Sequence, residues 1–331
     1  MSTDVQGFVS GLERILSDVH HDALIPGTDE TLYVVSRYRD RFERYTQLGL
    51  PPHDVVQRAL NKAVLATEAQ AVGMATPESR VCQEPQEALE AARRFGFPVL
   101  VKPVETVVEF GGQLLRHPSR LVGAEQALLE IQRQVGTCIV QRRVEGNVVS
   151  LAGVFTAEGV LSSVLVRHHR TWPPQAGSAS FVETIALDAT LTDRVRALAD
   201  AIGWRGLCQL QFVEGPGGVL HAIDFNPRLY GCLGVAAAAG APLAAIWCAA
   251  LLGETGLRLA GRAGVRWRME DTDARHALWL LSEGNYRDAA AAGLPRRGTT
   301  HAYYRARDPL PLVFRCAQLV QVRWRHARAA R

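Results

Sequence analysis

Two lysines stand out in this chain of 331 residues, because all its other basic residues, from a total of 37, are arginines. Lysine carries a compact ammonium on a thin, flexible stem, which suits it to contact the phosphates of a nucleotide. Lys102 ends the apolar, strand-like run Phe97 to Pro103, and Lys62 lies in a stretch with helical spacing. Codon bias would explain one surviving lysine, so the hypothesis depends on the residues that follow along the chain.

A second group of candidate residues lies on two expected strands, 207–213 and 219–225, joined by a glycine-rich turn. The polar side chains of this hairpin are Gln211, Asp224, Asn226 and, just past Pro227, Arg228. Carboxylate and amide oxygens bind hard cations, and residues two apart on a strand face the same side. With a guanidinium beside them, they suit the terminal phosphates of a magnesium nucleotide. Taken alone, the segment fits better with a strand end followed by an asparagine–proline turn, with Arg228 at the surface.

Composition describes an ordinary globular chain, 47% hydrophobic and 21% charged, long enough for two or three domains. The net charge of +4 is mild, and no pattern typical of DNA- or RNA-binding folds is present, so we expect no nucleic-acid partner.

The six cysteines lie far apart, which indicates reduced thiols and no zinc site. The first 19 residues lack the apolar core of a secretory signal. The uncharged stretch 232–253 is broken by glycine and proline, which favours two short buried helices over a membrane span, so we expect a cytoplasmic protein.

Hydrophobic spacing predicts helices and strands along most of the chain. Helices are expected at 3–19, 31–48, 54–72, 85–95, 121–135 and 191–203, and further strands at 137–143, 148–155 and 160–167. The polar section 167–184, rich in glycine, serine and proline, is expected to be a long active-site loop. Beyond residue 253 we expect short helices and an arginine-rich tail that is solvated or contacts a partner, with attachment to an acidic surface as the alternative.

Five segments, in this order, resemble the ATP-grasp enzymes: Asn61-Lys62, Gly96 to Pro103, Ile139 to Gly146, Gln209 to Phe212 and Ile223 to Arg228. The resemblance covers residues 61–253. It implies an α+β (α/β) ATP-grasp fold, in which two α+β subdomains clamp ATP. Residues 1–60 would be a partial pre-ATP-grasp region, either a short form or the result of a late start codon. Residues 61–255 would be the ATP-grasp domain, with a small lid-like subdomain at about 80–143, and residues 256–331 a helical, arginine-rich extension.

The resemblance also implies roles for individual residues. The residues that would bind ATP are Lys62 and Lys102 at the phosphates, and Gln141, Arg142 and Val144 at adenine, the last two through their backbones. Those that would bind Mg²⁺, or Mn²⁺ in its place, are Gln211, Asp224 and Asn226. The catalytic residues would be Lys102 and Arg228, which would steady the transferred phosphoryl group. Glutamine at the first metal position resembles the carbamoyl phosphate synthetase branch, and aspartate at the second replaces the usual glutamate, so the number of ions stays open.

The loop after Lys102, residues 104–112, departs from the family pattern. Many relatives place a serine- and glycine-rich cover over the phosphates here, whereas this chain has Glu105 and Glu109. Because these acids would repel a polyanion, either the loop points elsewhere or nucleotide binding is weakened.

Section 167–184 resembles the acceptor loop of ATP-grasp carboxylate–amine ligases. Arg167, Arg170, Ser178 and Ser180 would bind a carboxylate substrate and its acyl phosphate. His168 and His169 are either a base for an incoming amine or ordinary solvated histidines.

The leading hypothesis is an ADP-forming carboxylate–amine ligase, in which ATP phosphorylates a small-molecule carboxylate and an amine attacks the acyl phosphate. The alternatives are carbamoyl phosphate or carboxyphosphate chemistry, and an ATP-binding subunit without catalysis. The acid and the amine stay open. A homo-oligomer is an option, because an incomplete front domain would leave apolar surface for a partner to cover.

Overall fold

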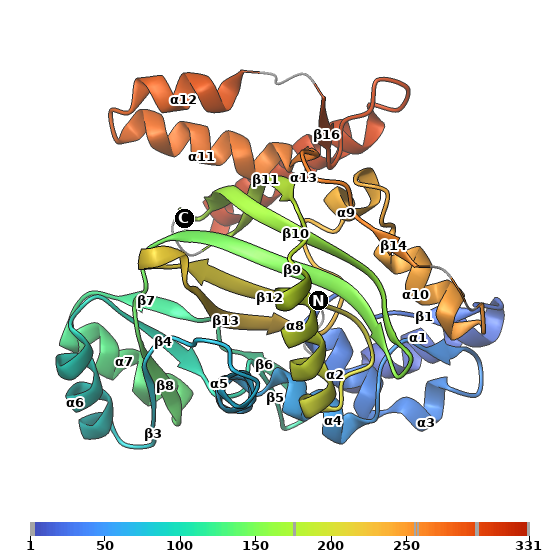
Figure 1. The fold of residues 1–331 in the computed structure, drawn as a ribbon, viewed down its shortest axis with the longest axis horizontal. Coiled ribbons are helices and arrows are strands. Elements are labelled where there is room, and N and C mark those ends of the chain that lie inside the picture. The colour runs from blue at the N-terminus through green and yellow to red at the C-terminus, as the bar shows by residue number, and fades with distance from the viewer. Residues whose placement is uncertain (1–3, 175–176, 255, 257, 295–297, 330–331) are drawn as a thin grey trace.

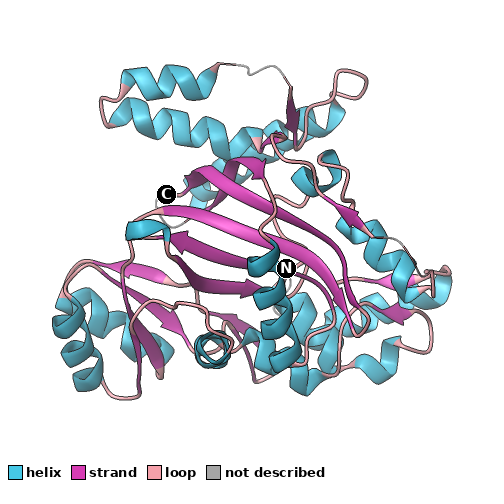
Figure 2. Cartoon of the chain, viewed as in Figure 1, coloured by secondary structure: helices cyan, strands magenta, loops and turns pink. Residues whose placement is uncertain are grey.

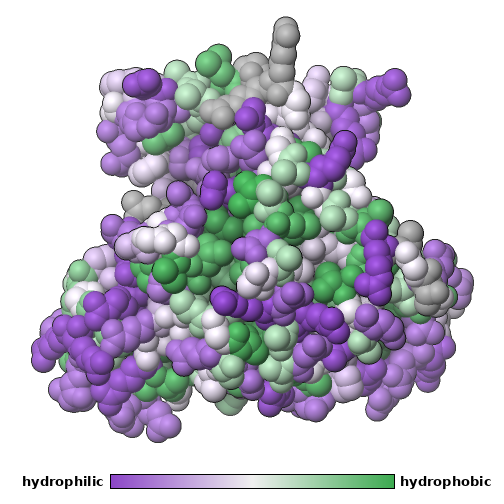
Figure 3. Space-filling view, in the orientation of Figure 1, coloured by the Kyte–Doolittle hydropathy of each residue, from purple (hydrophilic) through white to green (hydrophobic). Residues whose placement is uncertain are grey.

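The fold combines two β-sheets with flanking helices, as a computed structural model shows for residues 4–174, 177–254, 256, 258–294 and 298–329 (Figure 1). The larger sheet crosses the middle of the molecule and the smaller one lies beside it, with helices around both (Figure 2). In the same view, hydrophobic residues gather over the middle of the large sheet, and hydrophilic residues dominate the side formed by α6 (Pro85–Phe95) and α7 (Glu125–Val135) (Figure 3). The expectation of a mixed α+β fold is confirmed.

The N-terminal region is a set of short elements: α1 (Val5–Asp18), β1 (Ala23–Leu24), α2 (Asp29–Arg37), α3 (Arg39–Phe42), β2 (Gln47–Leu48) and α4 (His53–Leu60). Buried side chains such as Leu32 and Phe42 join the same core as one face of the large sheet. The single helix expected at 31–48 is therefore wrong in extent, because the helical part ends at Phe42 and the chain then turns into β2, which pairs with β1 in parallel.

The helix expected at 54–72 is two helices, α4 and α5 (Lys62–Ala71), because the chain breaks at Asn61. The backbone of Asn61 is extended (φ −83°, ψ 114°), and its side-chain oxygen accepts hydrogen bonds from the N–H groups of Ala63 and Val64 at 3.0 and 3.1 Å. Asparagine is a favoured N-cap, since it satisfies donors that the first helical turn leaves unpaired. The break places Lys62 at the first position of α5.

The small sheet has the strand order β3 (Ser79–Cys82), β8 (Cys138–Arg142), β4 (Val99–Pro103) and β7 (Arg120–Val122), all antiparallel. It packs against α6 and α7 around its own core, which includes Ala92, Val99 and Val140. Helix α6 has the expected bounds, whereas α7 begins four residues later than expected, because residues 120–122 pair with β4 as a strand. Lys102 lies on β4, the central strand beside β8.

The large sheet has the order β13 (Leu220–Asn226), β12 (Gly206–Glu214), β9 (Asn147–Thr156), β10 (Gly159–Trp172), β11 (Ser178–Ile185), β15 (Arg266–Arg268) and β16 (Thr299–His301), with β14 (Leu259–Ala260) beside β10. Its two faces bury different cores, as strand alternation requires. Leu151 on β9 faces the core that contains α8 (Ala189–Ile202), and Val154 faces the core that contains α9 (Gly234–Ala238) and α10 (Leu243–Leu251). The expectation of two short helices within 232–253 is confirmed. No helix of the described residues has the length and hydropathy needed to cross a bilayer.

The long loop expected at 167–184 is wrong for most of its length. Strand β10 continues to Trp172, β11 begins at Ser178, and the two pair antiparallel with Thr171 opposite Ala179. Residues 175–176 lie outside the described residues. The polar composition suggested a loop, but these polar side chains lie on strands and contact the cavity or other elements.

The remaining elements are a hairpin after β4, namely β5 (Val107–Phe110) and β6 (Gln113–Arg116), the short 3-10 helix η1 (Pro216–Gly218), and the C-terminal helices α11 (Glu270–Ser282), α12 (Tyr286–Gly293) and α13 (Leu310–Ala329). Helices α11 and α12 lie side by side at one edge of the large sheet (Figure 1). Of the tail arginines, those at 323, 325, 328 and 331 have side chains outside the described set.

Candidate active site

Two adjoining cavities lie against the large sheet, and the smaller of them lies between the large and the small sheet. The larger, of about 400 Å³, is polar, and its lining includes Lys62, Asp224 and Arg228. The smaller, of about 210 Å³, is lined by Lys102, Gln141 and mainly small or apolar side chains. Lys62 and Leu65 line both cavities. The two therefore form one cleft, whose larger, polar end contains Asp224 and Arg228 and whose smaller end contains Lys102 and Gln141.

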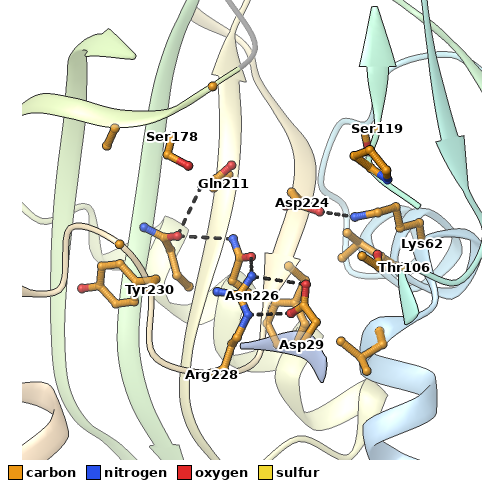
Figure 4. Close-up of a pocket in the computed structure, with 18 of the residues that line it drawn as sticks. Asp29, Lys62, Thr106, Ser119, Ser178, Gln211, Asp224, Asn226, Arg228 and Tyr230 are labelled. Carbon is orange, nitrogen blue, oxygen red and sulfur yellow. Dashed lines mark hydrogen bonds and ion pairs between the residues drawn. The ribbon is translucent and has the colours of Figure 1, made fainter. Parts of the chain in front are cut away.

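The β12–β13 hairpin forms the floor of the polar end. Gln209 is opposite Asn226, and Gln211 is opposite Asp224, so all four side chains are on one face of the hairpin. Figure 4 shows Gln211, Asp224 and Asn226 along neighbouring strands in the cavity. The structure thus brings together the three side chains expected to bind a metal. It adds Gln209, which the sequence analysis missed although its alternation with Gln211 was a usable signal.

Lys62 pairs with Asp224 across the cavity (Figure 4). Burial by itself would raise the pKa of the Asp224 carboxyl, but Lys62 and Lys102 outweigh burial and hold that pKa below its usual range. The carboxylate is therefore ionised at neutral pH.

Lys102 is almost fully buried, with 7% of its surface exposed, and its ammonium donates to the carbonyl oxygen of Ile223 at 2.8 Å. That carbonyl belongs to a bulge, since Gln211 pairs with Asp224 and Phe212 already pairs with Ala222. Burial, helped by the nearby charge of Lys62, lowers the pKa of Lys102 to about 8, with Asp224 acting in the opposite direction. At neutral pH Lys102 is therefore a desolvated cation in the wall of the smaller cavity.

Arg228 is held by Asp29, which lies in the first turn of α2 (Figure 4). The guanidinium donates to the two carboxylate oxygens of Asp29 at 2.6 and 3.3 Å, to Oδ1 of Asn226 at 3.0 Å and to the carbonyl of Leu229 at 3.0 Å. A guanidinium has five N–H donors, so four of them are engaged and one remains. Nothing in the local sequence pointed to Asp29, which is 199 residues away from its partner.

The segment expected to contact adenine lies beside the smaller end of the cleft. Gln141 is buried and lines the smaller cavity, and its Oε1 has no hydrogen-bond partner among the described residues. The N–H of Arg142 donates to the carbonyl of Glu78 at 2.8 Å, which removes that N–H from the groups expected to contact adenine. Val144 lies in the loop that follows β8.

Comparisons with known proteins agree with this arrangement. The large chain of carbamoyl phosphate synthase from Thermus thermophilus is 26% identical over 211 residues, which are 62% of this chain and 20% of that protein. The biotin carboxylase domain of the 2-oxoglutarate carboxylase of Hydrogenobacter thermophilus superimposes with a TM-score of 0.61 at 16% identity, over 78% of this chain and 60% of that one. The L-amino acid ligase of Bacillus licheniformis gives a TM-score of 0.57 at 15% identity, over 77% and 64%. No family model matches the chain.

The chain has the ATP-grasp fold, and part of its sequence is similar to carbamoyl phosphate synthase large chains. It spans about one fifth of the length of the carbamoyl phosphate synthase large chains. The proteins that share this fold include a carboxylase domain and a ligase, so the fold by itself does not select one reaction.

Of the four residues expected to bind a carboxylate substrate, Ser178 lines the large cavity and the other three do not. Arg170 donates to both carboxylate oxygens of the fully buried Asp273 at 2.6 and 2.8 Å, and Ser180 donates to the same carboxylate at 3.4 Å. Arg167 pairs with Glu214 at 3.4 Å. Arg167, Arg170 and Ser180 therefore contact acidic side chains of neighbouring elements, and the substrate-binding roles expected for them stay predictions.

The two histidines of β10 lie in different surroundings. His168 is buried, lines the large cavity and shares a hydrogen bond with Ser150 at 3.0 Å. Burial, with a smaller effect of His169, lowers the pKa of His168 to about 4, so its ring is neutral at pH 7. His169 is exposed and pairs with Glu183 at 3.0 Å. Of the two, only His168 lines the cavity.

The hairpin β5–β6 occupies the place of the expected phosphate cover. Glu109 pairs with Arg37 of α2 at 3.0 Å, and Arg116 pairs with Glu30 of the same helix at 3.3 Å. The hairpin thus packs on the N-terminal region. Glu109 therefore points away from the expected phosphate site, and Arg37 balances its charge. Its flanking residues Thr106 and Ser119 still line the large cavity.

Proposed function

We propose that this ATP-grasp chain is an ATP-dependent ligase that activates a carboxylate as an acyl phosphate for attack by an amine. The observation that carries the proposal is the convergence of Lys62, Lys102 and the β12–β13 hairpin on one cleft. Phosphoryl transfer needs mainly positioning and charge neutralisation from a protein, and these groups supply both.

Adenine would occupy the smaller cavity, with the triphosphate extending past the two lysines into the larger one. Ala63 and Ala66 of α5 and Val81 and Ile139 of the small sheet would contact the two faces of the base. The unpartnered Oε1 of Gln141 would accept a hydrogen bond from the 6-amino group. The small sheet would then act as the lid-like subdomain, because it contributes one wall of this cavity.

The donor set fits one Mg²⁺ ion held jointly with the phosphates. Asp224 is its only carboxylate, and Gln211 and Asn226 add amide oxygens on the same face of the hairpin. No cluster of three or more acidic, histidine or cysteine side chains suited to a metal occurs in the described part of the chain. Hard cations accept such a mixed oxygen set when phosphates and water complete it. When bound, the ion would neutralise phosphate charge, and Lys62 would be released from Asp224 to contact a phosphate.

The substrate carboxylate would lie at the other end of the large cavity, within reach of the remaining N–H of Arg228 and of Ser178. Trp172, Pro173 and Tyr230 line this end, which indicates a substrate with an apolar part beside its carboxylate. The similarity of the fold to that of an L-amino acid ligase supports the proposed ligase activity. Carboxyphosphate chemistry is the second candidate, favoured by the glutamine at position 211 and by the similarity to carbamoyl phosphate synthase.

A hydroxylamine trap tests the proposal and separates the candidates. The protein is incubated with MgATP, hydroxylamine and a panel of carboxylic acids including amino acids, with bicarbonate in a separate reaction. We expect ADP release and hydroxamate formation with at least one acid. ADP release with bicarbonate alone would favour carboxyphosphate chemistry. Tight MgATP binding without ADP release in either reaction would favour the subunit without catalysis.

A further inference from the structure

A line of hydrogen bonds runs along the floor of the large cavity from Arg228 to His168. It begins where Nη2 of Arg228 donates to Oδ1 of Asn226 at 3.0 Å. A guanidinium can only donate, so the oxygen of the Asn226 amide must face Arg228. The nitrogen of that amide then faces the other way and donates to Oε1 of Gln209 at 3.3 Å. Arg228 therefore determines which group donates and which accepts in the hydrogen bonds that follow.

The same reasoning assigns the donor and the acceptor in each of the next hydrogen bonds. Oε1 of Gln209 also accepts from Nε2 of Gln211 at 3.3 Å, so two donors fix the orientation of the Gln209 amide. Its Nε2 consequently donates to Oγ of Ser150 at 3.2 Å. The hydroxyl of Ser150 has a single proton, and its next neighbour in the line is Nε2 of His168 at 3.0 Å. Ser150 is fully buried and its hydroxyl has no other acceptor among the described residues, so we assign the hydroxyl as the donor to this nitrogen.

The consequence is a fixed tautomer at His168. If Nε2 accepts from Ser150, the proton of the neutral ring is on Nδ1. His168 has 6% of its surface exposed and lines the large cavity, and no hydrogen bond joins its Nδ1 to a described residue. The lowered pKa of His168, about 4, agrees with a ring that stays neutral through the physiological range.

We propose that His168 donates a hydrogen bond from Nδ1–H to an anionic or carbonyl oxygen of the molecule bound at the substrate end of the cavity. This inference rests on the proposed function for the identity of that molecule, a carboxylate or its acyl phosphate. It assigns His168 a role opposite to that of a base, because the lone pair of Nε2 is engaged by Ser150 and Nδ1 already carries a proton. A neutral donor can stabilise charge on a carbonyl or phosphoryl oxygen without titrating.

The direct test is nitrogen NMR of the protein labelled with ¹⁵N-histidine, without nucleotide, at pH 7. The resonances of His168 are assigned by their loss in His168→Leu. We expect the protonated nitrogen to be Nδ1 in the unaltered protein, and we expect Ser150→Ala to release the ring to the Nε2–H tautomer or a mixture. Ser162→Ala is the matched control, since it removes a buried hydroxyl of the adjacent strand that has no hydrogen-bond partner among the described residues. An Nε2–H ring in the unaltered protein, or a tautomer that does not respond to Ser150→Ala, would overturn the inference.

A second measurement tests the ligand. Acetate and inorganic phosphate are added in turn to the labelled protein saturated with MgADP, and at least one should shift the Nδ1 resonance of His168. Its binding should weaken by about tenfold in His168→Leu, while MgADP affinity stays the same. The donor role is refuted if neither anion shifts the Nδ1 resonance of His168 and neither binds His168→Leu more weakly than the unaltered protein. Failure of MgADP to bind at all would instead refute the proposed function, and the tautomer measurement, made without nucleotide, would still stand as an independent result.

Discussion

Replacing Lys102 by methionine should stabilise the nucleotide-free protein while weakening nucleotide binding. A pKa lowered from 10.5 to about 8 corresponds to a penalty of about 3 kcal/mol for keeping the buried ammonium charged at pH 7. Methionine removes that penalty with a side chain of similar length. It also leaves the carbonyl of Ile223 without its donor, which costs about 1 kcal/mol. The expected net gain in the free energy of unfolding is about 2 kcal/mol.

The pH dependence gives this prediction a sign that can be checked. Between pH 8 and 10.5 the unfolded chain keeps a proton on Lys102 that the folded chain has lost, so the stability of the unaltered protein rises with pH in this window. The methionine variant lacks this contribution. Its advantage should therefore be largest near pH 7 and shrink as the pH rises through 8 towards 10.5.

Lys62→Met is the matched comparison, because it also removes an ammonium from the cleft. Lys62 is paired with Asp224, however, so its loss leaves a partly buried carboxylate without its closest cation. We expect this variant to be less stable than the unaltered protein, the opposite sign to Lys102→Met. Both variants should bind MgATP about 10- to 100-fold more weakly, as expected for the loss of a charge-assisted contact with a phosphate.

The assays are urea unfolding followed by fluorescence at several pH values and calorimetric titration with MgATP. Equal destabilisation by both substitutions, with no pH dependence of the difference, would refute the account of Lys102 as a desolvated cation. Unchanged MgATP affinity in both variants would refute its place at the phosphates.

Three further predictions concern the contacts of single residues. Gln141→Leu should weaken ATP binding by about tenfold through loss of the acceptor for the 6-amino group, and calorimetry should show no such loss for a nucleotide with a 6-oxo group, as in ITP. Asp273→Asn should lower the free energy of unfolding by about 3–5 kcal/mol, because it leaves the partly buried Arg170 and Arg268 without their shared, fully buried counter-charge, and an unchanged urea midpoint would contradict this. Glu109→Gln should change stability by less than about 1 kcal/mol, since its partner Arg37 is half-exposed, and a large loss would mean that the hairpin is held mainly by this pair.

The sequence was most informative where local geometry decides the outcome. Residues two apart on a strand share a face, and a hairpin pairs its strands, so the grouping of Gln211, Asp224 and Asn226 could be predicted from their spacing alone. The two lysines were found by residue type, and the structure places both in the cleft. The order of the motifs along the chain then indicated the fold.

The features that were missed depend on contacts between distant parts of the chain. Asp29 reaches Arg228 across 199 residues, and Asp273 reaches Arg170 across 103, and neither acid has a local pattern that reveals its partner. The polar ends of β10 and β11 resemble a loop in the sequence because their side chains are satisfied by the cavity and by α11, which hydrophobic spacing cannot show. The end of α4 at Asn61 could have been predicted from the sequence, because asparagine is a strong N-cap even inside a helical pattern.

The central claim is that the two lysines and the β12–β13 hairpin bind one magnesium nucleotide together. Calorimetric titration of ATP, with Mg²⁺ and with Mg²⁺ removed by a chelator, tests it most directly on the unaltered protein and on Asp224→Asn. The account predicts that Mg²⁺ strengthens ATP binding to the unaltered protein by at least about tenfold and has little effect on the variant. Equal ATP affinity in all four titrations would contradict it.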